Sequence, residues 1–95
     1  MQGSDDFQAL CKIFFPGSRD GHPTLESWVA WAMDGYDAIT KKSIKDYLET
    51  LFAQGATDKE LEKIWHGASP SYDFSVGGHR LMFEAIFAHI NQHPN

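Results

Sequence analysis

The sequence predicts an all-α protein: a single compact bundle of about five helices over residues 1–95. Hydrophobic residues recur at three- and four-residue spacing along nearly all of the chain, which is the spacing of one face of an α-helix. Glycine and proline separate these stretches at intervals that suit short helices and connecting loops. Strand patterns do not alternate with helical ones, so nothing indicates a parallel sheet.

The first two helices are expected from residue 7 to the Pro-Gly pair at 16–17, and from Thr24 to Gly35. The apolar face of the first is formed by Phe7, Leu10, Cys11 and Phe14. Thr24 is suited to cap the second, because its side-chain oxygen can accept a backbone amide of the first turn. The apolar stripe of the second is Leu25, Trp28, Val29 and Ala32, with Trp31 to its side. A glycine commonly ends a helix, so Gly35 is the predicted stop.

A third helix is expected from Asp37 or Thr40 to Gln54, and Gly55 stands where a glycine often follows a helix end. Its apolar face is formed by Ile44, Leu48, Leu51 and Phe52, with Tyr47 beside them.

Thr57 and Glu60 have the spacing of a capping box, in which each side chain accepts the backbone amide of the other residue. They predict a short fourth helix that ends near Gly67, with Leu61, Ile64 and Trp65 pointing inward. A loop follows over residues 68–78, in which the alternation of Tyr72, Phe74 and Val76 allows a short extended piece. The last helix is expected over residues 79–91, with Phe83, Ile86, Phe87 and Ile90 on one side.

Charge narrows the possible partners. Thirteen acidic residues oppose eight basic ones, and the formal net charge is −5 at pH 7. Because proteins bind nucleic acid phosphates through Lys and Arg, direct nucleic acid binding is not expected, and a basic protein is favoured as partner. The small cluster of Lys41, Lys42 and Lys45 is offset by Asp46 and Glu49 and is interpreted as a solvent-exposed face.

The sequence favours a cytoplasmic protein. The single cysteine, Cys11, cannot form an internal disulfide, and its place on an apolar stripe is typical of a small core residue rather than a nucleophile. The first residues lack the basic and apolar regions of a signal peptide, and no apolar run approaches the ~20 residues of a membrane helix. We therefore expect no membrane association.

No catalytic, cofactor-binding or metal-binding motif is present, and we expect neither enzyme activity nor a cofactor. His89 and His93 are four residues apart and could share a zinc ion, but zinc sites use three or four protein ligands. The remaining histidines fall in a last helical turn (His66) or in or beside loops (His22 and His79). Asp34, Asp37 and Asp73 lie at positions where aspartate commonly forms a turn or caps a helix, and they are interpreted in that way. The alternative to a chain without enzyme activity is a small metal-dependent enzyme that uses these aspartates or histidines.

Several large aromatic residues lie outside the apolar stripes and next to acidic residues. Tyrosine and tryptophan are enriched at protein interfaces, and acidic neighbours would steer a basic partner. The predicted protein-binding residues are Trp31, Asp34, Tyr36, Asp37, Tyr47, Glu49, Tyr72 and Asp73.

The middle and the end of the chain also resemble a known family. The helical stretch 45–54, the glycine at 55 and the sequence TDKEL at 57–61 resemble the helix, glycine stop and T/S-D-x-E-L capping box of small bacterial contact-dependent growth inhibition immunity proteins. The sequence SYDF at 71–74, the Gly-Gly pair and the closing amphipathic helix are similar to the end of that family, with Phe83 where the family has Trp.

This resemblance implies a cytoplasmic antitoxin, monomeric and bound 1:1 to the C-terminal toxin domain of a contact-dependent growth inhibition effector. Such toxins are often nucleases, which tend to be basic because they must hold phosphate. An acidic chain without catalytic residues suits that role. The alternative is a helical regulatory adaptor that binds another protein.

Overall fold

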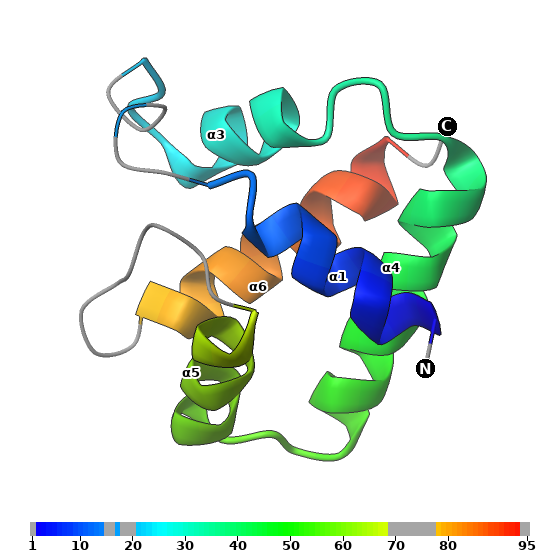
Figure 1. The fold of residues 1–95 in the computed structure, drawn as a ribbon, viewed down its shortest axis with the longest axis vertical. Helices are drawn as coiled ribbons and strands as arrows, with labels where there is room; N and C mark the ends of the chain where they lie inside the picture. The colour runs from blue at the N-terminus through cyan, green and yellow to red at the C-terminus, as the bar shows by residue number, and fades with distance from the viewer. Residues whose placement is uncertain (1, 15–16, 18–20, 69–77, 94–95) are drawn as a thin grey trace.

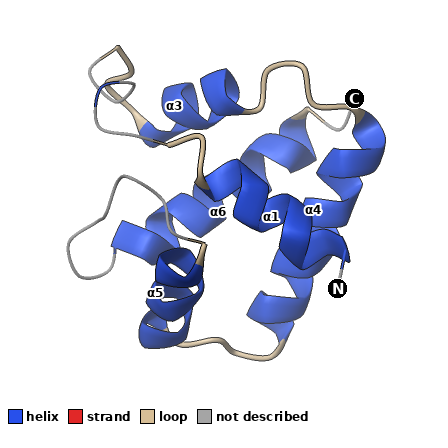
Figure 2. Ribbon diagram, in the orientation of Figure 1, coloured by secondary structure: helices blue, strands red, loops and turns tan. Residues whose placement is uncertain are grey.

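Five α-helices make up most of the chain that the computed structural model describes, which is residues 2–14, 17, 21–68 and 78–93. They are α1 (Gln2–Cys11), α3 (Leu25–Ala32), α4 (Ala38–Ala53), α5 (Asp58–Gly67) and α6 (Gly78–Gln92). Within these ranges there is no strand, as Figure 2 shows. The predicted all-α class is confirmed.

Helix α6 lies at the centre of the packing, where it contacts α3, α4 and α5, while α1 packs across α4 (Figure 1). The Phe7 ring of α1 connects three helices, because it lies 4.8 Å from the Phe83 ring of α6 and 5.6 Å from the Tyr47 ring of α4. Arg80 of α6 donates hydrogen bonds to the Asp58 carboxylate and the Ala56 carbonyl. The start of α5 is thereby held against α6.

The buried hydrophobic residues form one cluster that every described helix enters. Its members are Phe7, Leu10, Cys11, Phe14, Trp28, Val29, Ala32, Met33, Ile44, Leu48, Leu61, Trp65, Ala68, Met82, Phe83, Ile86 and Ile90. Most of the predicted helical stripes are therefore in the core. Five residues of the predicted stripes are only partly buried at its margin: Leu25, Leu51, Phe52, Ile64 and Phe87.

The first helix begins and ends about five residues earlier than predicted. It ends at Cys11, and two tighter turns follow, in which the amides of Ile13 and Phe14 donate to the carbonyls of Leu10 and Cys11 at 3.0 and 3.3 Å. Phe14 is nevertheless fully buried, as its spacing predicted, with its ring 4.8 Å from that of Trp28. The prediction of the helix end was wrong, because tertiary contacts bury Phe14 without an α-helical backbone.

Side-chain caps begin α3 and α4. Thr24 Oγ1 accepts the Ser27 amide at 3.1 Å, which confirms the predicted cap of α3. Asp37 Oδ1 accepts the Thr40 amide at 2.8 Å, so that α4 begins at the earlier of its two predicted starts. Such caps satisfy amides that have no partner inside the helix.

The predicted capping box starts α5. The Glu60 amide donates to Thr57 Oγ1 at 3.2 Å, and the Thr57 amide donates to the Glu60 carboxylate at 3.0 Å. The preceding Gly55 has φ +72°, a conformation that side chains with a Cβ rarely adopt. At the other end α5 includes Gly67, and Ala68 is its C-cap, one residue beyond the predicted stop.

Two polar residues are buried against expectation. Lys41, predicted to lie on a solvent-exposed face, is 6% exposed, and its Nζ donates to the His93 carbonyl at 2.9 Å. His79, expected beside the loop at the start of the last helix, is the second residue of α6, but it is only 3% exposed, with its ring 5.4 Å from that of His66. A lysine can be buried when its ammonium has hydrogen-bond partners, which local sequence does not reveal.

Two further predictions concern the loop and the membrane. Tyr72, Phe74 and Val76, for which an extended piece was considered, lie outside the described residues. Among the residues the structure does describe, no helix has the length and apolar character needed to span a membrane.

Candidate protein-binding surface

Six of the eight predicted binding residues lie in the described part of the chain: Trp31, Asp34, Tyr36, Asp37, Tyr47 and Glu49. Tyr72 and Asp73 lie outside it. The structure brings four of the six to the end of α3 and the turn that leads into α4, and places the other two elsewhere on α4.

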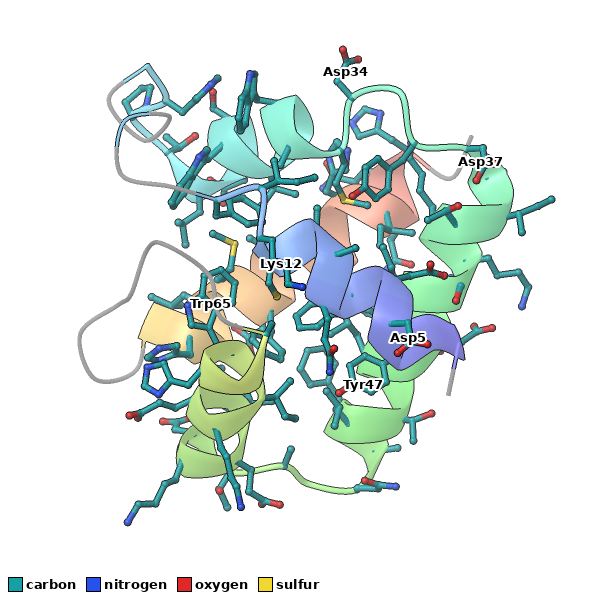
Figure 3. All side chains as sticks on the ribbon, in the orientation of Figure 1. Asp5, Lys12, Asp34, Asp37, Tyr47 and Trp65 are labelled. Atoms are coloured by element: carbon teal, nitrogen blue, oxygen red, sulfur yellow. The ribbon has the colours of Figure 1, made fainter. Side chains whose placement is uncertain are left out.

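The α3–α4 turn carries Asp34, Tyr36 and Asp37, with Asp34 near the end of α3 and Asp37 at the start of α4 (Figure 3). Backbone hydrogen bonds close this turn, with the Tyr36 amide donating to the Met33 carbonyl at 3.0 Å. Between them Gly35 has φ +87°, in the left-handed region that favours glycine. The predicted glycine stop is therefore also the residue that shapes this surface.

Helix α1 adds a further carboxylate to the turn. A hollow of about 250 Å³ is lined by Asp6, Ala9, Gly35, Tyr36, Asp37 and Thr40. We call Asp6, Asp34, Tyr36 and Asp37 the acidic corner. Sequence reasoning missed Asp6, which is 28 residues from Asp34 and approaches the turn only because α1 packs across α4.

Tyr36 is the half-buried centre of the acidic corner. Burial raises the pKa of its hydroxyl, and the negative charge of Asp6 raises it further. The hydroxyl therefore stays protonated at neutral pH and can donate a hydrogen bond. Where a tyrosine lies among carboxylates, a binding partner can contact an apolar ring and negative charges at the same place.

The two exposed acids of the turn have different roles. Hydrogen bonds from Thr40 hold the pKa of the Asp37 carboxyl below its usual value, because that carboxylate caps α4. Asp34 caps no helix, and Figure 3 shows its side chain projecting outward from the turn. Asp34 is thus the acid of the corner whose charge can be changed without removing the α4 cap.

Trp31 lies on α3 next to this turn, where its carbonyl accepts the Asp34 amide at 3.3 Å. Its side chain is 42% exposed, one of few large hydrophobic side chains at the described surface. The indole packs on the His22 ring at 5.6 Å, and His22 Nδ1 is 2.9 Å from Ser27 Oγ. A partly supported, partly exposed tryptophan of this kind is typical of an interface anchor.

Tyr47 and Glu49 do not join the acidic corner. The Tyr47 side chain lies between α4 and α1, half-buried against Phe7 (Figure 3). Glu49 is twelve residues beyond Asp37, about 18 Å along α4 at the helical rise per residue. Tyr47 therefore supports the packing of α1, and Glu49 belongs to a different part of the surface.

A second hollow lies on the other side of the same turn. It has a volume of about 420 Å³ and is lined by Ala30, Met33, Asp34, Gly35, Tyr36, Lys41, His89 and His93. The His89 and His93 rings are 4.8 Å apart, and the His93 amide, one residue beyond α6, donates to the His89 carbonyl at 2.9 Å. Across the described ranges, no three His, Cys, Asp or Glu side chains are grouped so that they could hold a metal ion.

Comparisons of the chain with protein-family models, with curated proteins and with solved structures gave no match.

Proposed function

We propose that this chain is an immunity protein that binds and neutralises a cognate toxin domain, with the acidic corner and Trp31 as its main contact surface. The toxin is the C-terminal domain of a contact-dependent growth inhibition effector, and a basic nuclease fits best. The proposal is supported by the sequence resemblance over residues 45–61 and 71–90 and by the net charge of −5.

The observation that most supports it is the composition of the acidic corner. The carboxylates of Asp6 and Asp37 line one hollow with the half-buried Tyr36, Asp34 projects from the same turn, and the exposed Trp31 lies on the neighbouring helix. Negative charge around aromatic anchors attracts a basic protein at long range and binds it at short range. A nuclease carries positive charge where it holds phosphate, so this surface would compete directly with its substrate.

The first experiment is co-expression with the toxin domain encoded beside the gene for this chain. The two chains are expected to co-purify in a 1:1 complex, and cells that express both are expected to survive the toxin. Survival must be compared with cells that express the toxin alone. Failure of the two to co-purify, together with no protection, would reject the proposal and leave the helical adaptor as the better interpretation.

The second experiment locates the binding surface by association kinetics. Asp34→Lys reverses a charge of the corner, and Asp37→Asn removes one while preserving the cap of α4, because asparagine caps as well as aspartate. Both should slow association at low ionic strength, and the difference should vanish near 1 M salt, where the Debye length is about 3 Å. Glu62→Lys on the distant α5 is the matched control and should have a smaller effect.

An equal slowing by the Asp34 and Glu62 variants would show that net charge, and not the corner, steers the partner. Trp31→Ala should mainly raise the dissociation rate of the complex, because a desolvated aromatic anchor stabilises the bound state and has little effect on the rate of encounter. Unchanged dissociation in that variant would remove Trp31 from the interface.

A further inference from the structure

The 420 Å³ hollow behind the α3–α4 turn, which we call the histidine hollow, has a different chemistry from the acidic corner. Its walls are the turn itself, the first part of α4 and the C-terminal end of α6. Three nitrogen-bearing side chains line it: Lys41 from α4, His89 from α6, and His93, the residue that follows α6. In a chain with a net charge of −5, this is a local concentration of basic groups.

These basic groups are close together. The His89 and His93 rings are 4.8 Å apart and tilted by 38°. The Lys41 ammonium donates to the His93 carbonyl at 2.9 Å, and the Lys41 side chain is almost entirely buried. Burial and the positive charges of His93 and Lys41 lower the pKa of His89. An anion bound among them would relieve this repulsion and favour protonated imidazoles.

The remaining polar side chains at the hollow leave room for an anion. Asp34 is the one carboxylate among its described lining residues, and its side chain projects outward from the turn (Figure 3). Tyr36 also lines the hollow, on the side of the turn. The nitrogen donors of the hollow thus come from two parts of the chain: α4 and the end of α6 with the residue that follows it.

We propose that the histidine hollow binds a phosphoryl group, as inorganic phosphate or as a phosphate monoester. A phosphoryl group brings a charge of about −1.5 to −2 near pH 7 and three strong acceptor oxygens, which suit two imidazoles and an ammonium. A carboxylate brings one charge and two oxygens. The volume is about fourteen times the ~30 Å³ that a water molecule occupies in the liquid, so an ester substituent also fits.

The test is an NMR titration of the full chain that follows the imidazole resonances near pH 6.5 in a phosphate-free buffer. Inorganic phosphate, ethyl phosphate and acetate are each added at constant ionic strength. We expect both phosphates to shift the His89 and His93 signals saturably and to raise the pKa of His89, and acetate to do neither. His66, which is exposed and outside the hollow, serves as the internal control.

Variants show whether the imidazoles bind the phosphate. His89→Gln and His93→Gln should each weaken binding about tenfold or more, as expected for loss of one charge-assisted hydrogen bond. His66→Gln is the matched control and should bind as the unchanged chain does. Lys41 is left in place, because its ammonium also joins α4 to the end of α6. Circular dichroism of each variant verifies that the helices are retained.

The two phosphates distinguish the sources of the group. Tighter binding of ethyl phosphate supports a monoester, and tighter binding of inorganic phosphate supports the free anion. The proposal is overturned if acetate shifts the same signals as strongly, if the shifts do not saturate, or if His89→Gln and His93→Gln bind phosphate unchanged. Phosphate binding in this titration does not depend on whether the chain neutralises a toxin, so the two proposals can fail separately.

Discussion

Two leucines of α4 offer a direct test of the packing. Leu48 and Leu51 are predicted from sequence to share one apolar face, yet Leu48 is completely buried and Leu51 lies at the margin of the core. We expect Leu48→Ala to lower the free energy of unfolding by about 3–4 kcal/mol, within the range for buried leucines. Leu51→Ala should cost less than about 2 kcal/mol, because less apolar surface is lost and water can fill the space.

These losses are large compared with the total. At about 0.05–0.15 kcal/mol per residue, 95 residues correspond to roughly 5–14 kcal/mol of stability. Leu48→Ala would therefore remove about a fifth or more of it, while Leu48→Met, which conserves volume, should cost under about 1.5 kcal/mol. Equilibrium urea unfolding, followed by helical circular dichroism and by tryptophan fluorescence, measures each difference.

The reasoning fails if Leu51→Ala costs as much as Leu48→Ala with the same dependence on urea concentration. That result would mean that Leu48 and Leu51 are buried to a similar extent, so that α4 is rotated about its axis relative to the packing described above. A change in the urea dependence itself would instead indicate an altered unfolded or native state, and the comparison would then rest on Leu48→Met.

Three further predictions follow from single residues. Thr57→Ala should lower the free energy of unfolding by about 1 kcal/mol through loss of the α5 cap, whereas Thr57→Ser should be nearly neutral in the same urea assay. Burial raises the pKa of the Cys11 thiol, so iodoacetamide should modify it only in unfolded protein; rapid labelling of the native chain would contradict this. Because the folded-state pKa of His89 lies below its usual 6.5, stability should be full above that pH and fall as pH decreases below it. In phosphate-free buffer, His89→Gln should flatten this decrease, and an unchanged pH profile would exclude His89 as its source.

Local signals in the chain predicted the helices well. Thr24, Asp37 and Thr57 are each found as helix caps, because a cap depends on residues only three positions apart. The acidic corner was predicted in part for the same reason, since Asp34, Tyr36 and Asp37 belong to one short turn. Asp6 could not be included, because nothing in the local pattern indicates that α1 crosses α4.

The predictions that failed depended on distance along the chain. Tyr47 and Glu49 have the residue types of an interface, but helical rise and the packing of α1 separate them from the corner. Lys41 has the flanking charges of a surface residue, yet it is buried. Its hydrogen bond joins residues 52 positions apart, and the spacing of residues along the sequence does not predict such a contact.

What the sequence by itself determined is therefore the class of fold, the start of α3, α4 and α5, and most of the core, since hydrogen bonds and apolar spacing within a helix are local. Only the tertiary structure decided which polar residues meet. The α3–α4 turn shares one hollow with Asp6 of α1 and another with Lys41, His89 and His93, because α1 and the end of α6 both approach it. The net charge of the chain is a sum over residues, but the grouping of its charged side chains depends on how distant helices pack.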